Sequence, residues 1–247
     1  ALHGVSLTVE NGEFLGIIGH TGSGKSTFVQ HLNGLLHPTT GTVTVNGVDI
    51  SASTEEAKKM RHKVGMVFQY PEHQLFEETI AEDIAFGPKN LGLSTDEVDE
   101  RVREAMKFVG LDYDTYAERS PFHLSGGQMR RVAIAGVVAM DPDFLVLDEP
   151  SAGLDPFGRE EIFEEIIRLH KEKGITVILV SHNMEDISRM ASRLVVLDKG
   201  RIVLDGEPMD IFNNHRDELQ VVGVDVPPVS VTMEYLHNCV ARPYKIY

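Results

Sequence analysis

The chain has 247 residues, 42% of them hydrophobic and 25% charged, which are the proportions of a large globular domain, with or without a small appendage. Its 38 acidic and 23 basic residues give a formal net charge of −15, which disfavours non-specific binding to nucleic acid and to anionic lipid. The single cysteine, Cys239, excludes an internal disulfide, and the longest apolar run, 132–140, is far shorter than the roughly 20 residues that span a bilayer. We therefore expect a reducing, cytosolic setting, no nucleic acid partner, and attachment to any membrane only through another protein.

Short runs with β-strand character alternate with helical patterns along most of the chain. We predict strands at 14–19, 42–47, 64–69, 144–149, 175–181, 193–198 and 201–206, and helices at 25–34, 94–108, 126–140 and 157–173. The run that starts at residue 175 is apolar throughout, as expected for a parallel strand covered on both faces. Strands that alternate with helices in this way predict an α/β fold.

The interval from about residue 70 to 142 shows helical patterns only. Ser94 is a predicted N-cap, and Glu97 stands three residues later at the position of a capping box. We predict a helical subdomain inserted here into a main domain that spans 1–205. Residues 206–247 are expected to form a small, mostly helical extension, for which a dimerisation role and a purely structural role remain equally open.

The first motif with chemical meaning is GHTGSGKST at 19–27, which fits G-x-x-x-x-G-K-[ST] and lies between a predicted strand and a predicted helix. In such a loop, glycines let backbone N–H groups turn inward around phosphates, and the following helix points its positive dipole end at the same oxygens. Lys25 supplies a charge for the β- and γ-phosphates, and the Ser26 hydroxyl is a ligand for Mg²⁺. The alternative, a strand–helix turn that binds nothing, fits this context poorly. The residues predicted to contact the nucleotide are Gly19, His20, Thr21, Gly22, Ser23, Gly24, Lys25, Ser26 and Thr27.

The second motif is FLVLDEP at 144–150, in which a hydrophobic strand ends in two carboxylates. Open α/β sheets bind ligands at the carboxyl ends of their strands. We predict that Asp148 holds Mg²⁺ through water and that Glu149 polarises the attacking water as general base. An acidic pair after a strand is often only structural, but its combination with a phosphate loop favours the catalytic interpretation.

The third motif is LSGGQ at 124–128, which precedes a predicted helix and therefore offers a second helix N-terminus suited to an anion. One nucleotide cannot easily use two such sites in one subunit. A head-to-tail pair of subunits can, if each covers the nucleotide of the other. An ordinary helix N-cap is the alternative interpretation. The residues predicted to act across such an interface are Ser125, Gly126, Gly127 and Gln128.

The ordered set of motifs resembles the ATP-binding-cassette (ABC) ATPases, and the resemblance covers residues 1 to about 205. It implies a P-loop NTPase fold of the ABC type, with ATP and Mg²⁺ as cofactors. It also implies that Gln69 contacts Mg²⁺ or the water and senses the γ-phosphate. The resemblance further implies that the loop SAGLD at 151–155 crosses the dimer interface, with Asp155 as its key carboxylate, and that His182 is the switch histidine that reaches the γ-phosphate.

One feature of the family is not found in this sequence. An aromatic residue that stacks on adenine normally precedes the phosphate loop, but no aromatic residue stands before Phe14, which is itself expected inside a strand. We expect the stacking residue to lie in an N-terminal piece that precedes this sequence, so the adenine contact stays unassigned.

The segment FQYPEHQLFEETIAEDIAFGPKNLGL, 68–93, is similar to that of energy-coupling-factor (ECF) transporter ATPases, relatives of the cobalt-transport ATPase subunits. This resemblance implies a peripheral, ATP-hydrolysing subunit on the cytoplasmic face of the cell membrane that powers uptake of vitamins or metal ions. Its partners are a second ABC ATPase, identical or paralogous, a transmembrane subunit with basic coupling helices, and a separate substrate-binding membrane subunit. The transported substrate is left open.

The same segment is a candidate docking surface for the transmembrane subunit. We expect an apolar floor and an acidic rim that receives arginines. The alternative is that Phe76 packs into the helical subdomain and the acids form a solvated face. The floor is predicted to be Leu75 and Phe76, and the rim Glu72, Glu77, Glu78 and Asp83.

Two other functions compete with this interpretation. A cassette ATPase that acts on DNA or ribosomes is disfavoured by the charge of −15 and by the lack of a coiled-coil insertion or a second cassette in this sequence. A regulatory partner that binds ATP without hydrolysing it is disfavoured because Glu149, His182 and LSGGQ are all intact.

Overall fold

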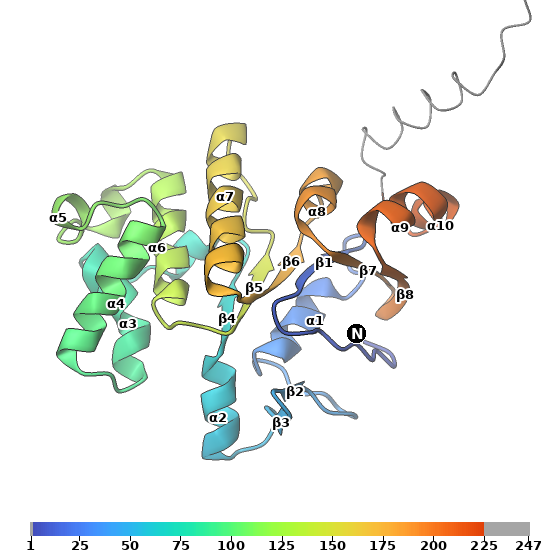
Figure 1. The fold of residues 1–247 in the computed structure, drawn as a ribbon, viewed down its shortest axis with the longest axis horizontal. Helices are drawn as coiled ribbons and strands as arrows, with labels where there is room; N and C mark the ends of the chain where they lie inside the picture. Colours follow the sequence, from blue (N-terminus) through green and yellow to red (C-terminus); the bar gives the residue numbers. More distant parts are fainter. Residues whose placement is uncertain (1, 225–247) are drawn as a thin grey trace, which may run out of the picture.

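The structure, a computed structural model, describes residues 2–224, and a six-stranded sheet lies at its centre (Figure 1). The strand order is β4-β5-β6-β1-β7-β8, in which every neighbouring pair is parallel except β7 and β8. The predicted α/β class is confirmed. The part of the C-terminal extension beyond residue 224 lies outside the described residues. The strands are β1 (Phe14–Ile18), β4 (Val64–Val67), β5 (Phe144–Asp148), β6 (Thr176–Val180), β7 (Arg193–Asp198) and β8 (Arg201–Gly206).

Each central strand is buried on both faces. Along β5, Leu145 and Leu147 contact one hydrophobic cluster, which contains Phe163, whereas Val146 between them contacts the other, which contains Phe28. Because side chains alternate across a strand, apolar residues at successive positions are needed to cover both faces. This explains why the strands predicted from unbroken apolar runs are found within two residues of their expected ends.

The predicted strand at 42–47 is instead a small hairpin of β2 (Thr44–Val45) and β3 (Val48–Asp49), paired antiparallel. Asn46 and Gly47 both have positive φ, 48° and 79°, in the turn between them. An Asn-Gly pair favours this type of two-residue turn, because both residues tolerate a left-handed backbone. The sequence run therefore contains a turn that its alternating pattern concealed.

One group of helices lies together at one end of the sheet. Within the predicted helical interval, the structure has only helices, and α3 packs against both α4 and α6 at the β4 end of the sheet (Figure 1). Ser94 caps α4, and the capping box with Glu97 is present as predicted. The helices are α1 (Lys25–Leu32), α2 (Glu55–His62), α3 (Ile80–Asn90), α4 (Thr95–Phe108), α5 (Tyr113–Tyr116), α6 (Gly126–Val138), α7 (Pro156–Lys173), α8 (Met184–Met190), α9 (Pro208–Asn214), α10 (Arg216–Val221) and the short 3₁₀ turns η1 (Pro71–Gln74) and η2 (Pro121–His123).

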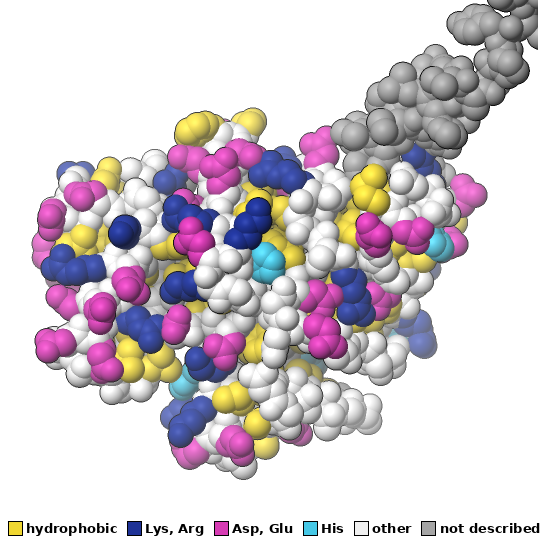
Figure 2. All heavy atoms as spheres, viewed as in Figure 1, with side chains coloured by type: hydrophobic (Ala, Val, Ile, Leu, Met, Phe, Trp, Pro, Cys, Tyr) yellow, Lys and Arg dark blue, Asp and Glu magenta, His cyan; other side chains and the backbone are white. Residues whose placement is uncertain are grey.

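Among the described residues, none of these helices is both long enough and apolar enough to cross a membrane. The face drawn in Figure 2 carries acidic and basic side chains interspersed, so the net charge of −15 is not gathered into one acidic area on that face.

Helix α7 offers a matched test of the core. Phe163 is 1% exposed and packs under the sheet, whereas Phe157, near the start of the same helix, is 74% exposed. Phe163→Ala should lower the free energy of unfolding by about 3–5 kcal/mol, because it removes buried apolar area and leaves a cavity. Phe157→Ala should change it by no more than about 0.5 kcal/mol. Urea unfolding of both variants checks this, and equal losses would contradict the packing described here.

Candidate nucleotide site

The candidate site lies at the carboxyl edge of the sheet, where four neighbouring strands, β4, β5, β6 and β1, all end. Each strand leads into a segment that the sequence singled out, and parallel pairing brings these segments to one edge. They surround a cavity of about 370 Å³. Its lining residues are Thr21, Gly22, Gly24, Lys25, Ser26, Thr27, Gln69, Asp148, Glu149 and His182.

The glycines of the phosphate loop have different reasons to be glycine. A Cβ on Gly19 would lie 2.3 Å from the carbonyl oxygen of Leu197 in β7, so a side chain here would collide with the neighbouring strand. Gly22 and Gly24 have φ of 84° and 109°, which other residues rarely adopt. A Cβ on Gly22 would meet no described atom within 4 Å, which leaves its backbone accessible from the cavity.

Lys25 opens α1 and folds back over the loop that precedes it. Its Nζ donates hydrogen bonds to the carbonyl oxygens of Gly19 at 2.6 Å and His20 at 3.0 Å. Burial lowers the pKa of Lys25, and the negative charges of Glu149 and Asp148 partly offset this effect. The ammonium group is therefore held at the loop and is partly removed from water. Both properties suit a cation that binds phosphate.

Not every predicted residue of the loop lines the cavity. The His20 ring reaches Asp198, with Nε2 2.9 Å from Oδ1, and its Nδ1 lies 2.7 Å from the carbonyl oxygen of Thr21. Ser23 is buried, and its hydroxyl has no hydrogen-bond partner among the described residues. Gly19 and His20 contribute through their carbonyl groups, which hold Lys25.

Asp148 is the last residue of β5 and Glu149 follows it, and both side chains are largely buried. Burial raises the pKa of Asp148, opposed by a hydrogen bond from the Ser26 hydroxyl and by the charge of Lys25. Burial also raises the pKa of Glu149 to about 7, opposed first by a backbone hydrogen bond from His182. The Glu149 backbone is left-handed, with φ of 51°, a conformation that costs a non-glycine residue on the order of 1–3 kcal/mol and is common at functional sites.

The carboxylate of Glu149 is not fully satisfied by hydrogen bonds. Its Oε1 is buried and has no hydrogen-bond partner among the described residues, while Nε2 of His182 lies 3.3 Å away. Burial is also the main cause that lowers the pKa of His182, which follows β6. A carboxylate that lines the cavity and has a pKa of about 7 has the properties of a general base near neutral pH.

The donor set fits Mg²⁺ that is shared with a phosphate. Ser26 and Asp148 both line the cavity, and the Ser26 hydroxyl helps to lower the pKa of the Asp148 carboxyl, so two hard oxygen ligands lie on the same wall. The described residues contain no group of three or more His, Cys, Asp or Glu side chains that could hold a metal by itself. Mg²⁺ usually takes only one or two protein ligands and completes its shell with water and substrate phosphates.

The LSGGQ segment and Asp155 are placed outside the cavity. Ser125 caps α6, accepting from the Gln128 backbone at 3.3 Å, and Gln128 Oε1 accepts from the Ser125 backbone at 3.1 Å. A Cβ on Gly126 or Gly127 would meet nothing within 4 Å among the described residues. Asp155 caps α7 by accepting from Gly158 at 2.7 Å. The structure therefore does not bring these residues to the nucleotide cavity of their own chain.

The proposed docking surface needs three corrections. Leu75 is 7% exposed and belongs to the hydrophobic core, because the chain after η1 turns it inward. Glu72 is not free for a partner, because Arg130 of this chain holds its carboxylate. Asp83 accepts hydrogen bonds from the backbones of Phe76 and Glu77, at 2.8 and 3.0 Å, and so shapes the loop.

An exposed aromatic pair takes the place of the expected floor. Phe76 is 57% exposed, so it is not buried within the helical subdomain and instead lies on its surface. Its ring lies edge-on to Phe86, 46% exposed, with 4.9 Å between ring centroids. Sequence reasoning missed Phe86. The available signal was a large apolar residue on the side of α3 opposite to Ile80 and Ile84, which are buried.

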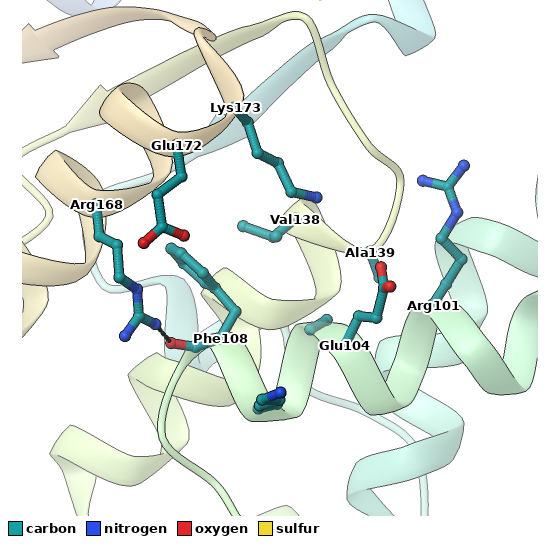
Figure 3. Close-up of a pocket in the computed structure, with 10 residues that line it drawn as sticks. Arg101, Glu104, Phe108, Val138, Ala139, Arg168, Glu172 and Lys173 are labelled. Atoms are coloured by element: carbon teal, nitrogen blue, oxygen red, sulfur yellow. Dashed lines mark hydrogen bonds between the residues drawn. The ribbon is translucent and has the colours of Figure 1, made fainter.

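A second cavity of about 350 Å³ lies between α4, α6 and the end of α7 (Figure 3). Charged side chains of both signs surround an apolar base, and Arg168 donates to the carbonyl oxygen of Phe108. None of the residues predicted to bind nucleotide lines it. We do not assign it a role in nucleotide binding.

Comparison with known proteins identifies the class of this fold and site. Residues 2–152 match the protein family described as "ABC transporter". The chain belongs to this family and is one of its ATPases.

Among curated relatives, the chain is 57% identical to the "Energy-coupling factor transporter ATP-binding protein EcfA2" of Clostridium tetani, over 96% of this chain and 82% of that protein. It is also 57% identical to the EcfA2 protein of Bacillus cereus, over 92% of this chain and 78% of that protein.

Two solved structures are similar. One is cbiO1 from Clostridium perfringens, described as part of the ABC transporter complex cbiONQ, with a TM-score of 0.79, 37% identity, and coverage of 95% of this chain and 92% of that one. The other is the cassette MJ0796, a dimer in a post-hydrolysis state bound to ADP and phosphate, with a TM-score of 0.74, 31% identity, and coverage of 84% and 90%.

The raised pKa of Glu149 predicts how stability depends on pH. The folded protein binds this proton more tightly than the unfolded chain does, so the cost of the charged carboxylate is complete above about pH 7 and disappears as the pH falls toward 4.5. Without nucleotide and in a chelator, Glu149→Gln should be more stable than the wild type at pH 8 by about 1–3 kcal/mol, and by much less at pH 5. Urea unfolding at both pH values measures this. The exposed control Glu100→Gln should show no such difference, and an equal gain at both pH values would contradict the assignment.

Proposed function

We propose that this chain is the ATP-hydrolysing subunit of an ECF-type importer, peripheral to the cytoplasmic face of the membrane, with ATP and Mg²⁺ as cofactors. The observation that carries the ATPase mechanism is the meeting of Lys25, Asp148, Glu149 and His182 at one cavity. The ECF assignment is supported by the names of the curated relatives at 57% identity. The work of such a subunit is to convert ATP hydrolysis into movement of a membrane partner that carries vitamins or metal ions.

Within the cavity, each residue has a role that follows from its position. Lys25 holds the β- and γ-phosphates, and Ser26 and Asp148 hold Mg²⁺, which supplies neutralisation of phosphate charge. Glu149, which lines the cavity, accepts a proton from the attacking water on its carboxylate. His182, whose Nε2 lies 3.3 Å from Oε1 of Glu149, senses the γ-phosphate, and Gln69 reports the same phosphate from the segment after β4.

The complete site requires a second subunit. Ser125 to Gln128 and Asp155 are placed at two helix N-termini outside the cavity of their own chain, and Ser125, Gly126 and Asp155 are exposed. Helix N-termini attract anions, so a head-to-tail partner can present α6 to the phosphates that this chain holds. Each nucleotide is then enclosed by two chains, and ATP joins the subunits until it is hydrolysed. The partner is a second copy or a similar ATPase.

The docking surface for the transmembrane subunit is formed by the exposed part of the loop after η1 and by Phe86 of α3 beside it. Phe76 and Phe86 supply the apolar area, and Glu77 and Glu78 beside them supply negative charge. A partner helix that carries both apolar and basic side chains fits this surface, because arginine–carboxylate contacts fix orientation while aromatic area contributes binding energy. The substrate is recognised by a separate membrane subunit.

Replacing the general base tests the hydrolysis mechanism and the composite site together. Glu149→Gln should lower kcat by about 10²–10⁴-fold, the usual scale for general acid–base catalysis, while ATP still binds. Light scattering on this variant should show dimers with ATP-Mg²⁺ and monomers without it. Lys25→Ala, the control, should lose ATP binding and remain monomeric. If Glu149→Gln hydrolyses ATP at the wild-type rate, the assignment of the base is wrong. If it binds ATP and stays monomeric, the free chain does not pair with itself, and pairing requires either a different ATPase or assembly on the membrane subunit.

Charge reversal tests the docking surface. Glu77→Lys combined with Glu78→Lys should abolish co-purification with the transmembrane subunit, because like charges then face each other. Its dissociation constant for ATP should stay within about twofold of the wild type, since neither residue lines the nucleotide cavity. The matched control reverses two exposed acids of α4, Glu100→Lys and Glu104→Lys, and should assemble normally. Normal assembly of the first variant would place the docking surface elsewhere.

A further inference from the structure

We propose that Arg130 is a positioning residue for ATP hydrolysis. Its guanidinium holds the helix that begins with LSGGQ, the segment after Gln69 and the loop that leads to Asp155 in one fixed arrangement. This inference rests on the proposed ATPase function. It adds the means by which movement at the docking surface reaches the two segments that are presented to the partner subunit.

The Arg130 side chain is 1% exposed and is one of the largest fully buried side chains of the described residues. Its Nε donates to Glu72 Oε2 at 3.2 Å, and its Nη2 donates to the same carboxylate at 3.1 and 3.2 Å. Its Nη1 donates to the carbonyl oxygen of Ala152 at 2.6 Å. All three guanidinium nitrogens are therefore engaged, and all by this chain.

Glu72 and Ala152, which accept the hydrogen bonds of Arg130, lie in segments that also carry predicted site residues. Glu72 lies in η1, three residues after Gln69, and four residues before Phe76 of the proposed docking surface. Ala152 lies in the turn between Glu149 and Asp155, and its backbone N–H donates to the Glu149 carbonyl oxygen at 3.1 Å. Arg130 of α6 thus links the segment that follows Gln69 to the turn between Glu149 and Asp155.

A second contact joins the same two loops directly. The Tyr70 ring lies against Gly153, with Cε1 3.7 Å from the position that a Cβ would take. Tyr70 has a left-handed backbone, φ 58°, and its ring stacks on His73 of η1 at 5.8 Å between centroids. The hydrogen bonds of Arg130 therefore link the segments after β4 and β5, and the Tyr70 ring lies close to the second of them.

Stability alone is a poor reason for this ion pair. Removing an arginine and a carboxylate from water is costly, and well-packed apolar residues of similar size often stabilise a core as much or more. A forked guanidinium–carboxylate contact gives direction, because both hydrogen bonds must be kept at once. If η1 moves as the partner helix docks, Arg130 must carry the start of α6 and residues 152–155 with it.

The test replaces the pair by apolar residues, Arg130→Met with Glu72→Met, so that no charge is left buried. We expect a Tm near that of the wild type and an ATP dissociation constant for the free chain within about twofold, because the phosphate loop is untouched. In the assembled transporter, kcat should fall about tenfold or more, within the range of usual coupling energies, with little change in KM. In the Glu149→Gln background, dimerisation should require a higher ATP concentration.

The control is a second forked ion pair, between Arg193 of β7 and Asp205 of β8. Nε and Nη2 of Arg193 lie 2.6 and 2.7 Å from the carboxylate oxygens of Asp205. Arg193→Met with Asp205→Leu should leave kcat and dimerisation unchanged. A purely structural role for Arg130 would lower Tm without separating kcat from KM.

The outcomes distinguish this inference from the proposed function. If the wild-type chain hydrolyses ATP and dimerises, and the Arg130–Glu72 variant matches it in kcat and in ATP-driven dimerisation, the inference is overturned alone. If the wild-type chain neither hydrolyses ATP nor dimerises, the proposed function fails and the inference fails with it.

Discussion

Parallel pairing of four strands in the order β4-β5-β6-β1 is the constraint on which the site depends. Parallel neighbours end at the same edge, so residues as distant in sequence as Lys25, Gln69, Asp148 and His182 line one cavity. The pairing is possible because the strands are apolar at successive positions and helices cover both faces of the sheet. A polar residue in the middle of β6 would therefore damage the nucleotide site without touching it.

The motif residues could be predicted from sequence because their roles depend on local chain geometry. The succession of a strand, a glycine-rich turn and a helix is enough to place Lys25 and Ser26 at the edge of the sheet. Strand β5 likewise brings Asp148 and Glu149 to this edge. The strand ends were predicted within two residues for the same reason, since burial on both faces leaves a clear apolar pattern. The role of each predicted site residue remains an expectation until the variants described above are measured.

What the sequence could not give were contacts between segments distant in the chain. Glu72 stands in an acidic stretch, so its sequence context predicts an exposed side chain. Only the packing of η1 against α6 brings it to Arg130, 58 residues later. Leu75 and Phe76 are adjacent apolar residues, but the turn after η1 buries the first and exposes the second. Phe86 lies ten residues beyond Phe76 and joins it only because α3 folds back beside the loop.

The charges in the cavity show that the site is built to be completed by its ligand. Burial raises the pKa of Asp148 and Glu149 and lowers the pKa of Lys25, so in each case the charged form is disfavoured. A cation beside Asp148 and phosphate beside Lys25 favour the charged forms that burial opposes. Ligand binding to the folded chain alone therefore adds stability, as mass action requires. The unfavourable electrostatics of the free site thus become a source of binding energy when the ligand supplies the missing charges.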